Sequence, residues 1–130
     1  MAETTVSAEV QAIFNSLLFL MCGFMVMFMA AGFAMLESGM VTSKSVSVIC
    51  AKNIGLYSIA GIMFWLFGYN LAYGIPEGGY IGTFTPWSDA SSVDTGYADG
   101  SDWYFQMVFC ATTVSICSGA MAERVKLWPF

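Results

Sequence analysis

Three long runs without a charged residue constrain this chain more than any other feature of its sequence. They contain 27, 24 and 20 residues, and they lie between Glu9 and Glu37, between Lys52 and Glu77, and between Asp102 and Glu123. At about 1.5 Å of rise per residue, a helix made from each run can cross a hydrocarbon layer of roughly 30 Å. Helices also satisfy their own backbone polar groups, as lipid requires. The sequence therefore predicts an all-α membrane protein with transmembrane helices over residues 10–36, 53–73 and 103–122.

Composition argues against the other common classes of protein. Only 10% of the residues are charged and 58% are hydrophobic, whereas an ordinary soluble domain is about 25% charged. The four Lys and Arg residues are too few to neutralise a nucleic-acid backbone, so no nucleic-acid partner is predicted. The chain has no histidine and shows no pairing of a nucleophile with a base. An enzyme is therefore the least expected class, and no cofactor is predicted.

The positions of the basic residues predict the orientation of the chain in the membrane. If the three helices run down, up and down, all four bases lie on one side, and they are Lys44, Lys52, Arg124 and Lys126. The positive-inside rule then predicts that this side is cytoplasmic, with the N-terminus and the loop 76–102 outside. The loop is rich in Gly, Ser, Asp and Pro, which is typical of an extramembrane connection with turns.

Most of the acidic residues fall on the predicted outer side. Seven of the nine lie there, namely Glu3, Glu9, Glu77, Asp89, Asp94, Asp99 and Asp102. They either make the outer surface mildly attractive to cations or form a solvated surface without a role. The other two, Glu37 and Glu123, lie at the inner ends of helices close to basic residues. Because acids are costly near membrane depth, ion pairs at the interface are expected for both.

Small residues recur at every fourth position of the third helix. Ala111, Ser115 and Gly119 form this stripe, and such spacing lets helix backbones approach closely in a membrane. We therefore expect them to pack against neighbouring helices in a larger bundle. The alternative is that small residues are simply common in membrane helices. The four cysteines form no CxxC pair, so reduced structural thiols are expected and no metal site is predicted.

Two phenylalanines are candidates for a pore entrance. Phe105 and Phe109 are four residues apart and therefore share one face of the third helix. If Trp103 marks the outer interface, their rings lie roughly 3 and 9 Å below it. Stacked rings at this depth could plug a pore, and a ring face stabilises a cation by about 0.5 to 2 kcal/mol. Simple packing of two phenylalanines is the alternative, and Phe64 on the second helix offers a comparison residue.

Three segments of the chain resemble the ammonium transporter family (Amt/Mep/Rh). They are AAGFAMLESGMVTSKSVSVICAKN, FWLFGYNLAYG and WYFQMVFCATTVSICSGAMAERVK, and they occur in the family's order. The resemblance covers nearly everything from Phe24 to Lys126 except the outer loop. The orientation predicted from the basic residues agrees with the topology of this family.

The resemblance implies a homotrimer in the cell membrane in which each subunit has its own narrow hydrophobic pore. The implied fold has eleven membrane helices, of which residues 1–130 would supply the N-terminal three. Ammonium would be recruited outside and deprotonated, and would cross chiefly as ammonia or as a net ion. Phe109 matches the family's outer gate phenylalanine, and Phe105 matches the ring beside the recruitment site. A PII-type regulatory protein is a possible partner at the inner face.

Because the family's pore histidines belong to later helices, these 130 residues alone are predicted to be inactive. Three other functions remain open from the sequence. The first is a membrane anchor or a non-transporting subunit with three helices. The second is an ammonium sensor, in which a transporter-like module is joined to a signalling domain. The third is conduction of a different small neutral gas.

Overall fold

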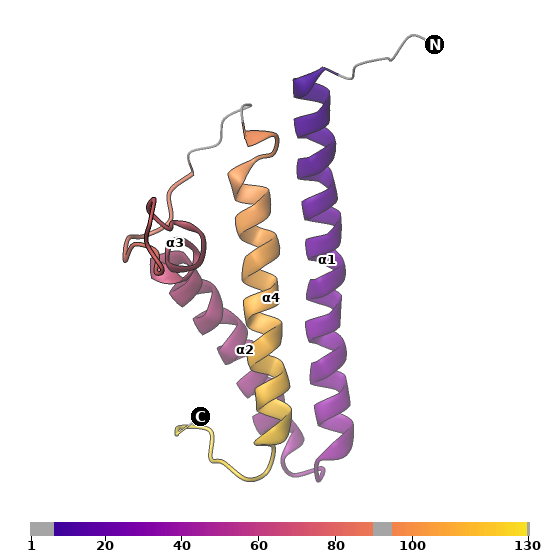
Figure 1. The fold of residues 1–130 in the computed structure, drawn as a ribbon. Helices are drawn as coiled ribbons and strands as arrows, with labels where there is room; N and C mark the ends of the chain where they lie inside the picture. The colour runs from indigo at the N-terminus through magenta and orange to yellow at the C-terminus, as the bar shows by residue number, and fades with distance from the viewer. Residues whose placement is uncertain (1–6, 90–94, 130) are drawn as a thin grey trace.

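The chain forms helices connected by one short turn and one long loop, and they pack into a small bundle. The computed structural model describes residues 7–89 and 95–129, so Glu3 and Asp94 lie outside the described part. The elements in chain order are α1 (Ala8–Met40), α2 (Val46–Met63), η1 (Phe64–Gly68), α3 (Tyr69–Tyr73) and α4 (Asp99–Ala120). α2, η1 and α3 continue from one another without a break. The described chain is therefore an arrangement of three helical rods (Figure 1).

Two of the rods have the length and apolar character of membrane spans. Within the described residues these are Ala8–Met40 and the continuous helical segment Val46–Tyr73. α4 is 22 residues long but begins with two acids in its first turn, Asp99 and Asp102. The all-helical architecture agrees with the prediction, while a third transmembrane helix and the eleven-helix fold stay predictions.

α1 and α4 lie side by side along most of the length of α4, and α2 crosses them at an angle (Figure 1). The apolar core is small and sits where α2 and η1 meet α4. Phe64, Met107 and Val108 form its buried centre. A core of this size leaves most of the apolar surface of α1 outside the bundle.

The predicted end of the second helix at Tyr73 is confirmed, whereas the other helix limits predicted from the charge-free runs are wrong by two to seven residues. α1 continues from Leu36 to Met40, and α2 begins at Val46, seven residues before the predicted start. Both differences have one cause, because Glu37 and Lys52 are buried inside the bundle and do not mark helix ends. α4 starts at Asp99, four residues early, since acids are favoured where the N–H groups of a first helical turn point outward. The loop predicted over 76–102 correspondingly ends at residue 98.

One wide helical turn fastens the outer loop to the second rod. In η1 the N–H of Tyr69 donates to the carbonyl of Phe64, five residues back, which is the spacing of a π-helix. The carbonyl of Trp65 accepts a hydrogen bond from the N–H of Trp87 at 2.9 Å. Further along, Asn70 Nδ2 donates to the carbonyl of Thr85 at 2.9 Å. The loop therefore folds back onto the helix that precedes it.

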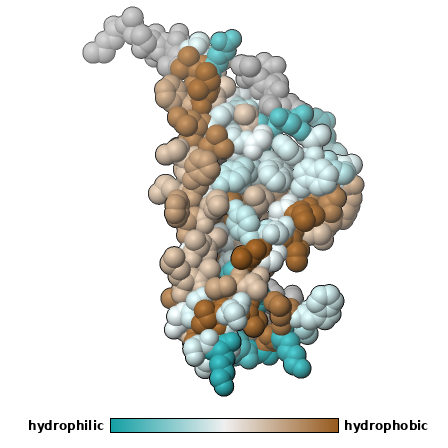
Figure 2. Space-filling view, turned by 180° about the vertical axis from the view of Figure 1, so that it is seen from behind, coloured by the Kyte–Doolittle hydropathy of each residue, from teal (hydrophilic) through white to brown (hydrophobic). Residues whose placement is uncertain are grey.

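The surface of the molecule is apolar along α1 and polar toward its two ends. Figure 2 shows brown, hydrophobic residues following α1 for most of its length, with teal residues at the lower end and a further group near the upper end. Large exposed side chains on α1 include Phe14, Met25 and Phe28. The lower end carries the four bases, which line one depression together: Lys44, Lys52, Arg124 and Lys126. Apolar surface of this extent on one helix is typical of contact with lipid or with further helices.

Candidate functional site

The aromatic pair on α4 lies in the half of the bundle away from the basic residues. The ring centroids of Phe105 and Phe109 are 5.0 Å apart with an interplanar angle of 78°, an edge-to-face contact. Phe105 also contacts Phe19 of α1, with centroids 5.7 Å apart. Phe109 is 42% exposed, so one side of its ring faces out of the described bundle. In this pair the ring of Phe105 is held against α1, and the ring of Phe109 is partly exposed.

Gly23 allows α1 to approach α4 closely at this level. It is buried, and a Cβ atom added to it would lie 2.7 Å from Cε1 of Tyr104. A side chain at position 23 would therefore require the Tyr104 ring to shift, next to the backbone of Phe105. The sequence carried one signal for this role, since Gly23 stands alone in a stretch of large apolar residues. The spacing of small residues on the third helix gave no indication of Gly23.

A buried carboxylate stabilises the outer end of α4. Asp102 accepts a hydrogen bond from the hydroxyl of Tyr69 at 2.7 Å and one from Gln106 Nε2 at 3.4 Å, each on a different oxygen. Beside it, Trp87 from the outer loop stacks on Trp103 with centroids 5.2 Å apart. The expectation that Asp102 belongs to a solvated outer surface is therefore wrong, because its carboxylate is paired with a tyrosine from the second rod.

The three residues of the predicted small-residue stripe differ in how deeply they are buried. Ala111 and Ser115 are buried in the bundle, and Gly119 is exposed. A Cβ atom added to Gly119 would lie 3.6 Å from Oε1 of Glu37, which is ordinary contact distance. Ser118, which is fully buried, lies on the neighbouring face.

At the opposite end, polar groups from three helices meet around Glu37 of α1. Glu37 is 5% exposed, and its Oε2 accepts a hydrogen bond from Ser118 Oγ at 3.1 Å and one from Asn53 Nδ2 at 3.4 Å. Lys52 of α2 is also buried, and its Nζ donates to the carbonyl of Ser118 at 3.3 Å. We call these four residues the inner polar cluster. The contacts shown for Glu37 are thus to a hydroxyl and an amide, not to the interfacial bases that the sequence suggested.

Glu123 follows α4 and ties it to the turn between α1 and α2. Its Oε1 accepts hydrogen bonds from the N–H of Thr42 at 2.8 Å and from the Thr42 hydroxyl at 2.7 Å. Hydrogen bonds from the Thr42 backbone and side chain, and from the Ser45 hydroxyl, lower the pKa of Glu123 below its ordinary value. Its partners are again uncharged, so the expected ion pair with Arg124 or Lys126 is replaced by hydrogen bonds.

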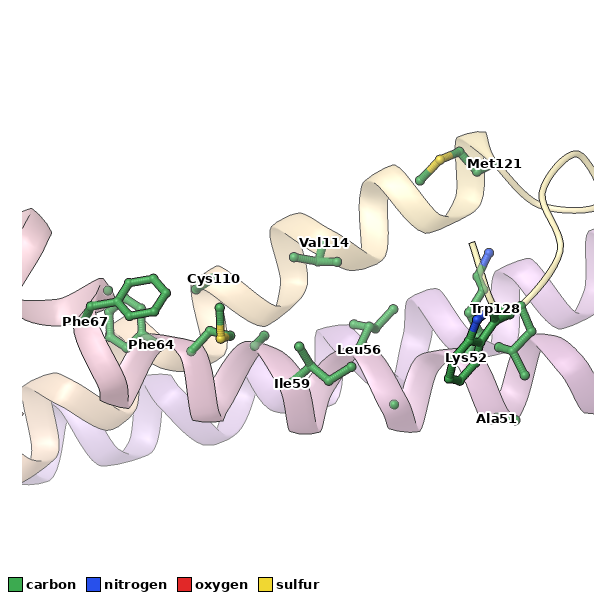
Figure 3. Close-up of a pocket in the computed structure, with 15 residues that line it drawn as sticks. Ala51, Lys52, Leu56, Ile59, Phe64, Phe67, Cys110, Val114, Met121 and Trp128 are labelled. Carbon is green, nitrogen blue, oxygen red and sulfur yellow. The ribbon is translucent and has the colours of Figure 1, made fainter. Parts of the chain in front are cut away.

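An apolar cavity of about 650 Å³ lies between α2 and α4. Figure 3 shows Phe64 and Phe67 at one end, Cys110 and Val114 on the α4 wall, and Lys52 with Trp128 at the other end. Within the described residues no group of three or more Cys, Asp and Glu side chains could hold a metal ion, and the four cysteines are free. The lining is mainly apolar, with the Lys52 amine and the Cys110 thiol as its reactive groups.

The apolar helices, the aromatic pair near one end and the basic opposite end fit a membrane-integral helical protein. Residues 17–130 match the family model described as Ammonium Transporter Family. The chain therefore belongs to the ammonium transporter family, and the resemblance read from its motifs is confirmed.

Curated relatives agree with this assignment. Ammonium transporter Amt2 of Archaeoglobus fulgidus is 39% identical over 82% of this chain and 22% of its own length. A protein of Synechocystis sp., provisionally named as an ammonium transporter, is 38% identical over 86% of this chain and 20% of its own length. Ammonium transporter Amt2 of Haloferax mediterranei is 38% identical over 80% of this chain and 24% of its own length. The chain thus spans roughly a fifth of the length of these relatives, and no solved structure gives a significant match.

Proposed function

We propose that the complete transporter carrying this sequence conducts ammonium or ammonia through a narrow pore, with Phe105 and Phe109 at its outer entrance. One observation carries the assignment of these residues. The rings of Phe105 and Phe109 are in edge-to-face contact on one face of α4. Phe105 also packs against Phe19 of α1, whereas the ring of Phe109 is partly exposed. An open ring offers its π face to an ammonium ion before the ion loses its water.

The proposal includes the orientation and the assembly. All four bases lie at the end of the bundle away from Phe105, which supports an N-terminus outside the plasma or inner membrane and a cytoplasmic basic end. The homotrimer and the PII-type partner at the inner face come from the family resemblance and remain part of this proposal. Ammonium would be deprotonated at the outer entrance, and residues 1–130 alone would not conduct it.

The test is the change Phe109→Ala in the complete transporter. Loss of the ring removes a cation contact of about 0.5 to 2 kcal/mol, so the apparent affinity for ammonium should fall by about 2- to 30-fold. Uptake of ammonium by a cell line without its own transporters measures this change. Unchanged uptake kinetics would remove Phe109 from the entrance.

The structure also selects the control for this experiment. Phe64 is buried in the core, so its removal would disturb folding and it is a poor comparison. Phe28 is 79% exposed on the apolar surface of α1, and Phe28→Ala should leave uptake unchanged. Residues 1–130 expressed alone should give no uptake, and saturable uptake by them would contradict that part of the proposal.

A further inference from the structure

The depression lined by Lys44, Lys52, Arg124 and Lys126, which we call the basic depression, has more bases than acids. Its volume is about 520 Å³, and Glu123 is the one acid among the described residues that line it. Hydrogen bonds already engage one oxygen of that acid. Lys44, Arg124 and Lys126 are exposed, and within residues 7–89 and 95–129 they form no ion pair with an acid. The basic depression therefore carries an excess of positive charge, which suits an anionic group.

The N-terminus of α2 lies at the basic depression. α2 begins at Val46, and its neighbours Ser45 and Val48 line the depression beside the bases. The Ser45 side chain makes no capping hydrogen bond to this helix end. Unsatisfied N–H groups in a first helical turn favour an anion, so they add to the attraction of the bases. A phosphate group fits both features.

The apolar cavity between α2 and α4 begins where the basic depression ends. Lys52 and Leu127 line both, so the two hollows are adjacent. Figure 3 shows the cavity extending from Lys52 along α2 to Phe64. Phe64 follows Lys52 by twelve residues, which corresponds to about 18 Å of helix. Since the hydrocarbon of one leaflet is about 15 Å thick, the cavity is long enough to hold an acyl chain through one leaflet.

We propose that an anionic phospholipid binds here, with its phosphate in the basic depression and one acyl chain in the apolar cavity. Charge complementarity selects the head group, because Lys44 and Arg124 can pair with phosphate oxygens. The apolar lining selects a lipid over a free anion, since Leu56, Ile59 and Val114 gain contact only with a hydrocarbon chain.

The membrane setting agrees with this ligand. The family is membrane-integral, and the orientation proposed above puts the basic end in the cytoplasmic leaflet. Anionic lipids give that leaflet its negative surface potential. Lipid binding at this site goes beyond the proposed function and does not require conduction of ammonium.

The experiment titrates the complete, delipidated transporter in detergent with dioleoyl phosphatidylglycerol or dioleoyl phosphatidylcholine. Native mass spectrometry measures the apparent dissociation constants, and the parent should bind the anionic lipid more tightly. Lys44→Gln should weaken its binding about fivefold, and Lys44→Gln with Arg124→Gln about 25-fold. Lys44→Arg keeps the charge and should bind like the parent. An unchanged preference for the anionic lipid in the double variant would overturn the proposal.

A second pair of variants tests the acyl chain. Gly55 lines the apolar cavity, and a Cβ atom added to it meets nothing within 4 Å, so Gly55→Leu fills the cavity without a clash at Cβ. Gly32 of α1 has the same open space outside the cavity, which makes Gly32→Leu the matched control. Gly55→Leu should weaken lipid binding about 15-fold, equivalent to two buried methylene groups, while the control should bind like the parent. Equal affinities of the two variants would reject the cavity as the acyl-chain site.

The same measurements distinguish other occupants of this site. If a later segment of the complete chain fills the cavity, lipid binding will be the same in every variant, and the proposal fails. If the site takes a free anion, inorganic phosphate will displace the lipid and Gly55→Leu will have no effect, which also rejects the proposal. Because these readouts do not measure transport, their failure would leave the proposed function standing. A parent that binds the lipid but carries no ammonium would reject only the proposed function.

Discussion

Both ends of the bundle bury a carboxylate, but the two carboxylates are bonded differently. At the outer end, Asp102 has a donor on each oxygen, Tyr69 on one and Gln106 on the other. At the inner end, Glu37 has two donors on Oε2, and its buried Oε1 has no donor among the described residues. A carboxylate with a donor on each oxygen is fully paired, whereas a buried oxygen without a donor carries a cost in free energy. The same chemical group is thus fully paired at the outer end and partly paired at the inner end.

The largest effect is expected from Tyr69→Phe. Removal of this hydroxyl leaves one oxygen of a buried carboxylate unpaired, which costs about 3 kcal/mol for a charged acceptor. Chemical denaturation of the purified transporter in detergent measures this loss as a change in the free energy of unfolding. Tyr80→Phe is the matched control, because the Tyr80 ring is almost fully exposed in the outer loop. Equal stability of the two variants would show that Asp102 does not depend on Tyr69.

Gly23→Ala should be the next most damaging change. Its new methyl group would lie 2.7 Å from the Tyr104 ring, and overpacking of this kind costs about 2 kcal/mol. The apparent melting temperature of the transporter should fall accordingly. Gly32→Ala in the same helix meets nothing within 4 Å and should not destabilise the protein. If Gly23→Ala is as stable as Gly32→Ala, close approach of α1 and α4 does not position Phe105.

A smaller effect is expected from Ser118→Ala at the inner end. Glu37 keeps its bond from Asn53 on the same oxygen, so loss of the Ser118 hydroxyl should cost only about 1 kcal/mol. The free energies of unfolding of Ser118→Ala and Tyr69→Phe should be measured by chemical denaturation under identical conditions and compared. If Ser118→Ala proves the more destabilising of the two, the two carboxylates do not differ in the way described above.

The smallest effect is expected from Glu123→Gln, and it should depend on pH. The pKa of Glu123 is lowered in the folded protein, chiefly by hydrogen bonds from Thr42, so its carboxylate stabilises the fold above the ordinary value of 4.5. This contribution is lost as the pH falls through the lowered pKa. The difference in melting temperature between the parent and Glu123→Gln should therefore be present at neutral pH and shrink as the pH falls below the ordinary value of 4.5 and through the lowered pKa. A difference that grows on acidification would have the wrong sign.

Local patterns in the sequence predicted the helices and the shared face of the aromatic pair. A charge-free run reports directly on the free energy of transfer into lipid, and residues four apart on a helix must lie on one face. The same reasoning failed at the helix limits, where it treated each charge as a boundary. Glu37 and Lys52 are charges inside helices, and only their partners on other helices make this possible.

Sequence alone therefore determined the class of this protein, its basic end and the pairing of Phe105 with Phe109. Tertiary structure alone decided which acids are buried and which oxygen of Glu37 has no donor among the described residues. The physical reason is distance along the chain. Hydrophobicity and helical periodicity are properties of neighbouring residues, whereas a buried carboxylate is stabilised by partners that lie far away in sequence. Ser118 stands 81 positions from Glu37, and only the packing of α4 against α1 brings them together.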